Sequence, residues 1–91
     1  MLAKLFDIIQ DRKLNPVSMS YTNALFDLGP DRIAQKVGEE AIELIIAARA
    51  QGKERTIEES GDLLYHLLVL WVDLGISVQD IETELAGWHK N

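Results

Sequence analysis

The chain has no cysteine and no apolar run long enough to cross a membrane. Without cysteine, a disulfide framework and a thiolate zinc site are both excluded, and a reducing compartment such as the cytoplasm is compatible with the sequence. The longest apolar stretch, residues 63–72, covers ten residues around a histidine, whereas a membrane span needs about 20. The first twelve residues have apolar side chains at helical spacing and no basic start. We therefore expect a folded N-terminal helix, no signal peptide, no membrane association and a cytoplasmic location.

Positive charge is also scarce, with nine lysines and arginines against 15 acidic residues and a net charge of −6. Nucleic acids are held by basic side chains, so a nucleic-acid partner is not expected. An anionic small substrate would need metal ions to mask the repulsion. The 91 residues are enough for a single domain, 1–91, whose small core would gain from a partner subunit.

Prolines and glycines number only two and six, and they divide the chain into helical segments without any strand-like alternation or internal repeat. Asn15-Pro16 stops the first helix, and Pro30 suits the first turn of the third. Thr56 and Glu59 have the spacing of a capping box, which predicts that the fourth helix opens there. The fold class is therefore all-α, a small bundle of four or five helices at about 2–13, 22–27, 30–51, 56–74 and 77–88.

Two carboxylate pairs are the most informative feature: Glu40-x-x-Glu43 and Glu59-x-x-Asp62, separated by 15 residues. Residues three apart on a helix share a face, with Cβ atoms roughly 5–6 Å apart. Two such helices packed antiparallel would bring four carboxylates together, which is costly unless a hard cation such as Mg²⁺ neutralises them. Each pair therefore predicts half of a metal site.

On helical wheels, the polar residues of both central helices fall in narrow arcs of about 100°. Apolar side chains fill the remainder, so we expect both helices to be mostly buried, with the two polar stripes facing each other. The excess of apolar surface also predicts a dimer. The stripes consist of Lys36, Glu39, Glu40 and Glu43 on the third helix and of Glu58, Glu59, Asp62, His66 and Asp73 on the fourth.

Simpler explanations exist for most of these residues. An acidic stripe is usually a solvated helix face, and a capping box alone explains Glu59. His66 alone is more often a core or rim histidine than a ligand. Asp62 is harder to dismiss, because aspartate is a poor helix former and here precedes ten nearly unbroken apolar residues. A di-iron carboxylate site would need Glu-x-x-His on two helices, and that spacing does not occur.

The longer strings around the acids carry a family resemblance. The runs 29–43 and 59–70, with Ser20-Tyr21-Thr22 ahead of them, resemble the phosphoribosyl-ATP pyrophosphatases of histidine biosynthesis, and the likeness extends over about residues 2–89. The acid signature alone is similar to the wider MazG-like, all-α nucleoside triphosphate pyrophosphohydrolases. The resemblance implies Mg²⁺-dependent hydrolysis of phosphoribosyl-ATP between its α and β phosphates, giving phosphoribosyl-AMP and pyrophosphate. It also implies a homodimer and a functional partnership with phosphoribosyl-AMP cyclohydrolase.

Roles for individual residues follow as hypotheses from this resemblance. Glu40, Glu43, Glu59 and Asp62 would bind Mg²⁺ directly or through water. Glu39 is the candidate to orient or deprotonate the attacking water, although Glu39 and Glu40 could exchange roles. The remaining candidates are substrate-binding residues: Arg32 and Lys36 for phosphate, with helix salt bridges as the alternative, and Tyr65 and His66 for base or ribose, with hydrogen bonding within the core as the alternative.

Three functions are compatible with these residues. The first is a phosphoribosyl-ATP pyrophosphatase. The second is a house-cleaning enzyme for other nucleoside triphosphates, which would share the metal site but need a different base pocket. The third is a non-catalytic helical oligomerisation module, which would bind no Mg²⁺.

Overall fold

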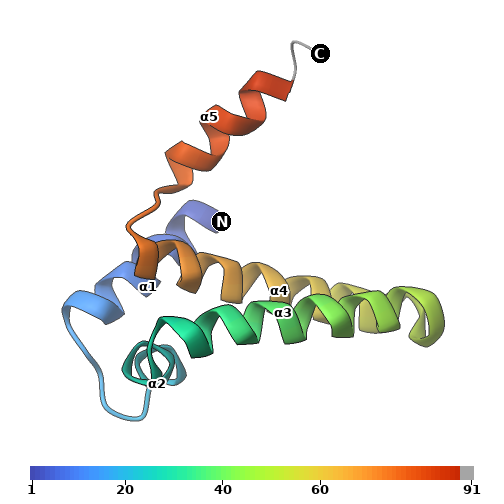
Figure 1. Ribbon diagram of the computed structural model, residues 1–91, viewed down its shortest axis with the longest axis horizontal. Helices are drawn as coiled ribbons and strands as arrows, with labels where there is room; N and C mark the ends of the chain where they lie inside the picture. The colour runs from blue at the N-terminus through green and yellow to red at the C-terminus, as the bar shows by residue number, and fades with distance from the viewer. Residues whose placement is uncertain (89–91) are drawn as a thin grey trace.

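The computed structural model describes residues 1–88, which form helices joined by short connections (Figure 1). The all-α class predicted from the sequence is confirmed, and the described residues contain no strand. In chain order, the elements are α1 (Leu2–Leu14), α2 (Tyr21–Leu28), α3 (Pro30–Ile46), a π-helical turn η1 (Ala47–Gln51), α4 (Gly52–Leu74) and α5 (Val78–Trp88).

The two longest helices, α3 and α4, form an antiparallel hairpin (Figure 1), and their contact is the most extensive between any two helices of the described chain. At the tip of this hairpin, η1 passes directly into α4 through Gly52, whose φ of 87° lies in the left-handed region. Glycine adopts this angle without the steric cost that a Cβ atom brings. The two acidic segments are thereby placed on neighbouring antiparallel helices.

The predicted start of the fourth helix is wrong. Helix α4 begins at Gly52, so Thr56 already lies inside it, and its hydroxyl donates to the Gly52 carbonyl at 2.8 Å. The physical reason is that the glycine turn lets helical structure restart at once, without a capping side chain. A reciprocal cap is present instead before α5, where the Asp80 amide donates to Ser77 Oγ at 3.0 Å and the Ser77 amide to Asp80 Oδ2 at 2.9 Å.

The core lies at the end of the hairpin that α1 and α2 cover. Its fully buried side chains are Ile9 from α1, Ile33 from α3, and Leu68 and Val69 from α4. Helices α1 and α2 contact each other, and they pack on α4 and α3 respectively. Glu40, Glu43 and Glu59 lie between this core and the hairpin tip, whereas Asp73, at the other end of the predicted stripe, pairs with Lys13 of α1.

The expectation that both central helices are mostly buried is wrong for the single chain. Ile42, Ile45 and Ile46 of α3 and Ile57 of α4 are exposed. Helix α5 projects away from the hairpin (Figure 1) and has no buried residue. The helices of residues 1–88 thus leave part of both central helices uncovered.

No single helix among residues 1–88 has the length and apolarity needed to cross a bilayer. Only the bent pair Pro30–Leu74 and Val78–Trp88, with an angle of 112° between its parts, reaches that length and composition jointly.

Candidate metal centre

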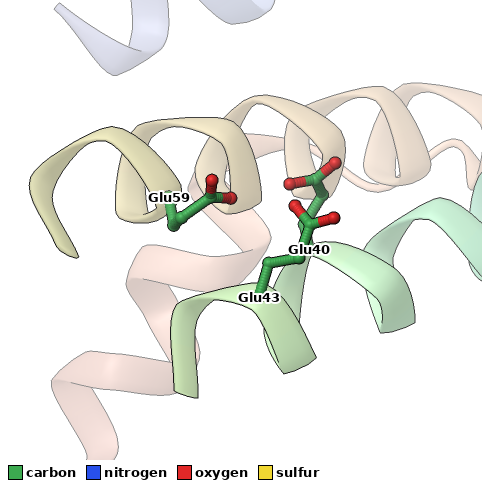
Figure 2. Close-up of side chains that lie close together, drawn as sticks. All are labelled: Glu40, Glu43 and Glu59. Atoms are coloured by element: carbon green, nitrogen blue, oxygen red, sulfur yellow. The ribbon is translucent and has the colours of Figure 1, made fainter. Parts of the chain in front are cut away.

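Three carboxylates meet between α3 and α4. Glu40 and Glu43 reach from α3 and Glu59 from α4, and each offers an oxygen within 4.8 Å of those of the other two. Figure 2 shows the three side chains directed into the space between the helices. Glu40 and Glu59 retain only 6% and 4% of their accessible surface, whereas Glu43 is exposed. The meeting of the two acidic segments, inferred from their spacing, is thus present for three of the four predicted ligands.

Each buried glutamate has one oxygen paired with a cation and one left over. Lys36 Nζ lies 3.5 Å from Glu40 Oε1, and Arg55 Nη2 donates to Glu59 Oε1 at 2.5 Å. The other oxygens, Glu40 Oε2 and Glu59 Oε2, are buried without any hydrogen-bond partner in the described chain. A buried unsatisfied carboxylate oxygen is costly, and a hard cation between the helices would satisfy both at once.

The pKa values of Glu43 and Glu59 are shifted in opposite directions. The close approach of the Glu40 carboxylate, followed by the repulsion of its negative charge, raises the pKa of Glu43 above the usual range. Burial opposes ionisation of Glu59, but the guanidinium of Arg55, with the neighbouring Glu43 carboxyl, outweighs it and lowers the pKa of Glu59. Glu43 therefore holds a proton at a higher pH than an ordinary glutamate, while Glu59 stays ionised.

Arg55 is the residue that the sequence reasoning missed. It is half exposed on α4 and donates to the Glu58 carboxylate at 2.9 Å as well as to Glu59. Both contacts raise the pKa of Arg55, the one with Glu59 more strongly, so Arg55 stays protonated. Its position four residues before Glu59 was the available signal, because that spacing puts the two side chains on one helix face.

Asp62 lies outside the group of three. It is exposed on α4, one turn beyond Glu59. Glu39 has a buried, unpartnered Oε2 but is likewise not one of the clustered carboxylates. Arg32 is exposed, and no salt bridge joins it to another residue in the part of the chain that the structure describes.

Tyr65 and His66 form a second polar group, which joins α2 to α4. His66 Nδ1 lies 2.7 Å from the Asp62 carbonyl oxygen, so this nitrogen must donate, and Nε2 is left to accept from the Tyr21 hydroxyl at 2.9 Å. The Tyr65 and Thr22 hydroxyls are hydrogen-bonded to each other. These contacts fit the alternative in which Tyr65 and His66 bond within the fold.

The set of available atoms defines the chemistry. Carboxylate oxygens without thiolate or imidazole partners favour Mg²⁺, Mn²⁺ or Ca²⁺ over zinc or copper. The cluster lies beside cations on both helices, Lys36 on α3 and Arg55 on α4. Such a site suits a phosphate-bearing ligand held jointly by metal and side chains.

Comparison with known proteins gives consistent matches. The sequence model of the phosphoribosyl-ATP pyrophosphohydrolase family matches residues 2–89. A phosphoribosyl-ATP pyrophosphatase of Clostridium acetobutylicum is 51% identical over 85 residues, covering 93% of this chain and 77% of the relative. Another from Lacticaseibacillus casei is 51% identical over 83 residues, or 91% and 76% of the two chains. A histidine biosynthesis bifunctional protein of Caldanaerobacter subterraneus is 48% identical over 99% of this chain, which spans only 44% of that relative.

Proposed function

Because the chain belongs to the phosphoribosyl-ATP pyrophosphohydrolase family, we propose that it hydrolyses phosphoribosyl-ATP to phosphoribosyl-AMP and pyrophosphate. The single observation that best supports this from the structure is the pair of buried, unpartnered oxygens on Glu40 and Glu59 beside Glu43. A scaffold with no catalytic role would have no reason to maintain that costly arrangement.

Mg²⁺ is the proposed cofactor, held by Glu40, Glu43 and Glu59, with Asp62 as a further ligand directly or through water. When bound, the ion would neutralise charge on the phosphate oxygens and on the developing transition state. The carboxylates supply the anionic oxygens that this ion prefers. The paired oxygens of Glu40 and Glu59 keep their contacts with Lys36 and Arg55, which leaves the unpartnered ones for the ion.

Glu39 is the proposed base. Its Oε2 is buried without a partner and lies outside the three clustered carboxylates, so it can accept a proton while they hold metal. Water forms a new O–P bond, the bridging bond between the α and β phosphates breaks, and the water's proton passes to the Glu39 carboxylate. Pyrophosphate leaves with the electron pair of the broken bond.

Lys36 and Arg32 are proposed to contact the substrate phosphates. Both belong to α3 and lie one and two turns before Glu40. Lys36 is paired with Glu40 at 3.5 Å, so the helix salt bridge considered as its alternative is present. Arg32 is exposed and has the planar fork that binds phosphate bidentately.

A homodimer is proposed from the uncovered apolar surface. The exposed isoleucines at positions 42, 45 and 57 lie near the hairpin tip. A largely apolar cavity of about 610 Å³ also opens between α5 and the bundle, with a lining that includes Leu64, Leu68, Trp71, Ile81 and Leu85. A second copy presents matching apolar helices, and covering such patches is what stabilises most small homo-oligomers. A monomer in sedimentation at micromolar concentration would overturn this part of the proposal.

A cyclohydrolase partner is proposed only as a functional neighbour. The relatives from Caldanaerobacter subterraneus and Thermoanaerobacter pseudethanolicus are named as bifunctional histidine biosynthesis proteins. Phosphoribosyl-AMP, the product of the proposed reaction, would be the substrate of the cyclohydrolase.

The test is pyrophosphate release from phosphoribosyl-ATP with and without Mg²⁺, measured beside ATP, dCTP and dUTP. Glu43→Gln should lower the rate by about a hundredfold or more, since losing a direct metal ligand exceeds the 10–100-fold cost of losing an outer partner. Asp62→Asn tests the fourth ligand. Glu54→Gln is the matched control, because Glu54 is an exposed acid in the first turn of α4 outside the cluster.

Each outcome selects a function. Mg²⁺-dependent release from phosphoribosyl-ATP, lost in Glu43→Gln and kept in Glu54→Gln, supports the proposal. Release from ordinary nucleotides alone would indicate the house-cleaning activity. No release from any substrate, and no effect of Glu43→Gln on any property, would leave a helical oligomerisation module.

A further inference from the structure

A small cavity borders the carboxylate cluster on the side of the hairpin tip. It has a volume of about 220 Å³ and is lined by Glu43 of α3, Ile46, Gln51 and Arg55 of α4. Glu43 belongs to the cluster itself, so the cavity adjoins the candidate metal centre. It is smaller than the roughly 300–1,000 Å³ pockets that hold drug-sized ligands. Its size and its arginine suit a small anion such as phosphate or pyrophosphate.

Arg55 is the cation in the lining of this cavity. Its guanidinium has five N–H donors and uses Nη1 on Glu58 and Nη2 on Glu59. The Glu58 carboxylate is exposed, and exposed ion pairs within a helix contribute little to stability. Arg55 can therefore give up that contact for an incoming anion at small cost.

The charges around the cluster explain which anion would enter. Lys36 lies beside Glu40 toward the start of α3, and Arg55 lies beside Glu59 near the hairpin tip, so a cation flanks the acids at each end. A chain of phosphates laid across the cluster would meet metal in the middle and a basic side chain at either end. Arginine is suited to the terminal position, because its planar fork matches two oxygens of one phosphate.

We propose that this cavity is the subsite for the pyrophosphate group, both as the β and γ phosphates of the substrate and as the released product, and that Arg55 is its binding residue. This inference rests on the proposed function for the identity of the substrate. It assigns a binding role to a residue outside the acid pairs and the α3 cations.

The test is calorimetric titration of the full chain with Mg²⁺ alone and then, at saturating Mg²⁺, with inorganic pyrophosphate. Arg55→Gln should weaken pyrophosphate binding about tenfold or more, the usual loss when a charge-assisted hydrogen bond is removed. Arg55→Gln should not weaken the binding of Mg²⁺ in the absence of pyrophosphate. The substitution removes a positive charge that repels the ion. Arg55→Lys, which keeps the charge without the fork, should fall between Arg55→Gln and the unaltered chain.

Lys53→Gln is the matched control for charge. Lys53 is exposed two residues from Arg55, on another face of α4, and does not line the cavity. It should bind pyrophosphate like the unaltered chain.

Several results would overturn the subsite. Equal weakening of Mg²⁺ and pyrophosphate in Arg55→Gln would make Arg55 a positioning residue for Glu59. Unchanged pyrophosphate binding in Arg55→Gln, or equal weakening in Lys53→Gln, would also exclude it. The proposed function can fail independently of the subsite. If pyrophosphate binding depends on Arg55 but phosphoribosyl-ATP is not hydrolysed, the subsite is supported and phosphoribosyl-ATP is excluded as the substrate.

Discussion

The Tyr21 hydroxyl donates to Nε2 of His66 at 2.9 Å, across the contact between α2 and α4. His66 is buried, and its other ring nitrogen already donates to the Asp62 carbonyl. The pair therefore attaches the start of α2 to the helix that contributes Glu59 and Asp62. The Tyr21, Tyr65 and His66 rings also pack against one another, with centroids 5.2–6.3 Å apart.

Removing this hydroxyl should destabilise the fold. Tyr21→Phe keeps the ring contacts but leaves His66 Nε2 buried without a donor, which costs about 1–3 kcal/mol. Urea denaturation followed by circular dichroism measures the free energy of unfolding. Tyr65→Phe is the comparison, since its partner Thr22 can turn its hydroxyl elsewhere. Equal free energies for Tyr21→Phe and the unaltered chain would show that this hydrogen bond contributes nothing.

Two glycines of the same helix should respond to alanine in opposite directions. Gly52 has a φ of 87°, where a Cβ is strained, so Gly52→Ala should cost about 1–2 kcal/mol. Gly61 is helical, and a Cβ there meets nothing within 4 Å, so Gly61→Ala should stabilise the chain by about 0.5–1 kcal/mol. Thermal unfolding of both variants checks the pair. Destabilisation by Gly61→Ala would instead place Gly61 against a second subunit.

The sequence supported much of the fold because its signals are local. Pro30, Gly29 and Gly75 mark helix ends by backbone angles that only particular residues tolerate, and the structure places ends at those residues. The fourth helix was misplaced because Thr56 and Glu59 satisfy the capping pattern, while the conformation of Gly52 that starts the helix leaves no pattern of its own.

The site was predictable in part for the same reason. The spacing of Glu40, Glu43 and Glu59 puts them on facing stripes, and these three do meet. Arg55 was not anticipated, because a cation four residues before an acid is common on any helix. What distinguishes Arg55 is the cavity beside it, and that depends on how the hairpin tip turns. The exposed apolar surface likewise depends on how the described helices pack, which no local pattern specifies.

Metal binding should release protons in mildly acidic solution. The pKa of Glu43 is raised by the neighbouring Glu40 carboxylate, so between the ordinary glutamate pKa and this raised value Glu43 is still protonated and the ion must displace that proton. The affinity for Mg²⁺ should therefore rise with pH through this window and level off above it. Titration in buffers of different ionisation enthalpy counts the protons released. Glu43→Gln should release none, and a pH-independent affinity in the unaltered chain would contradict the role of Glu43.

Removal of the metal should show whether Glu43 contributes to the stability of the fold or only to metal binding. In a chelator, Glu43→Gln should unfold at a temperature no lower than the unaltered chain, because one member of a repelling carboxylate cluster becomes neutral. Added Mg²⁺ at about 100 times its dissociation constant should stabilise the unaltered chain by about 2.7 kcal/mol, whereas Glu43→Gln should show no such gain. Glu54→Gln should follow the unaltered chain in both conditions. A fall in the unfolding temperature of Glu43→Gln in chelator would show that Glu43 contributes to the fold itself, and an equal gain with Mg²⁺ in all three chains would place the ion away from this cluster.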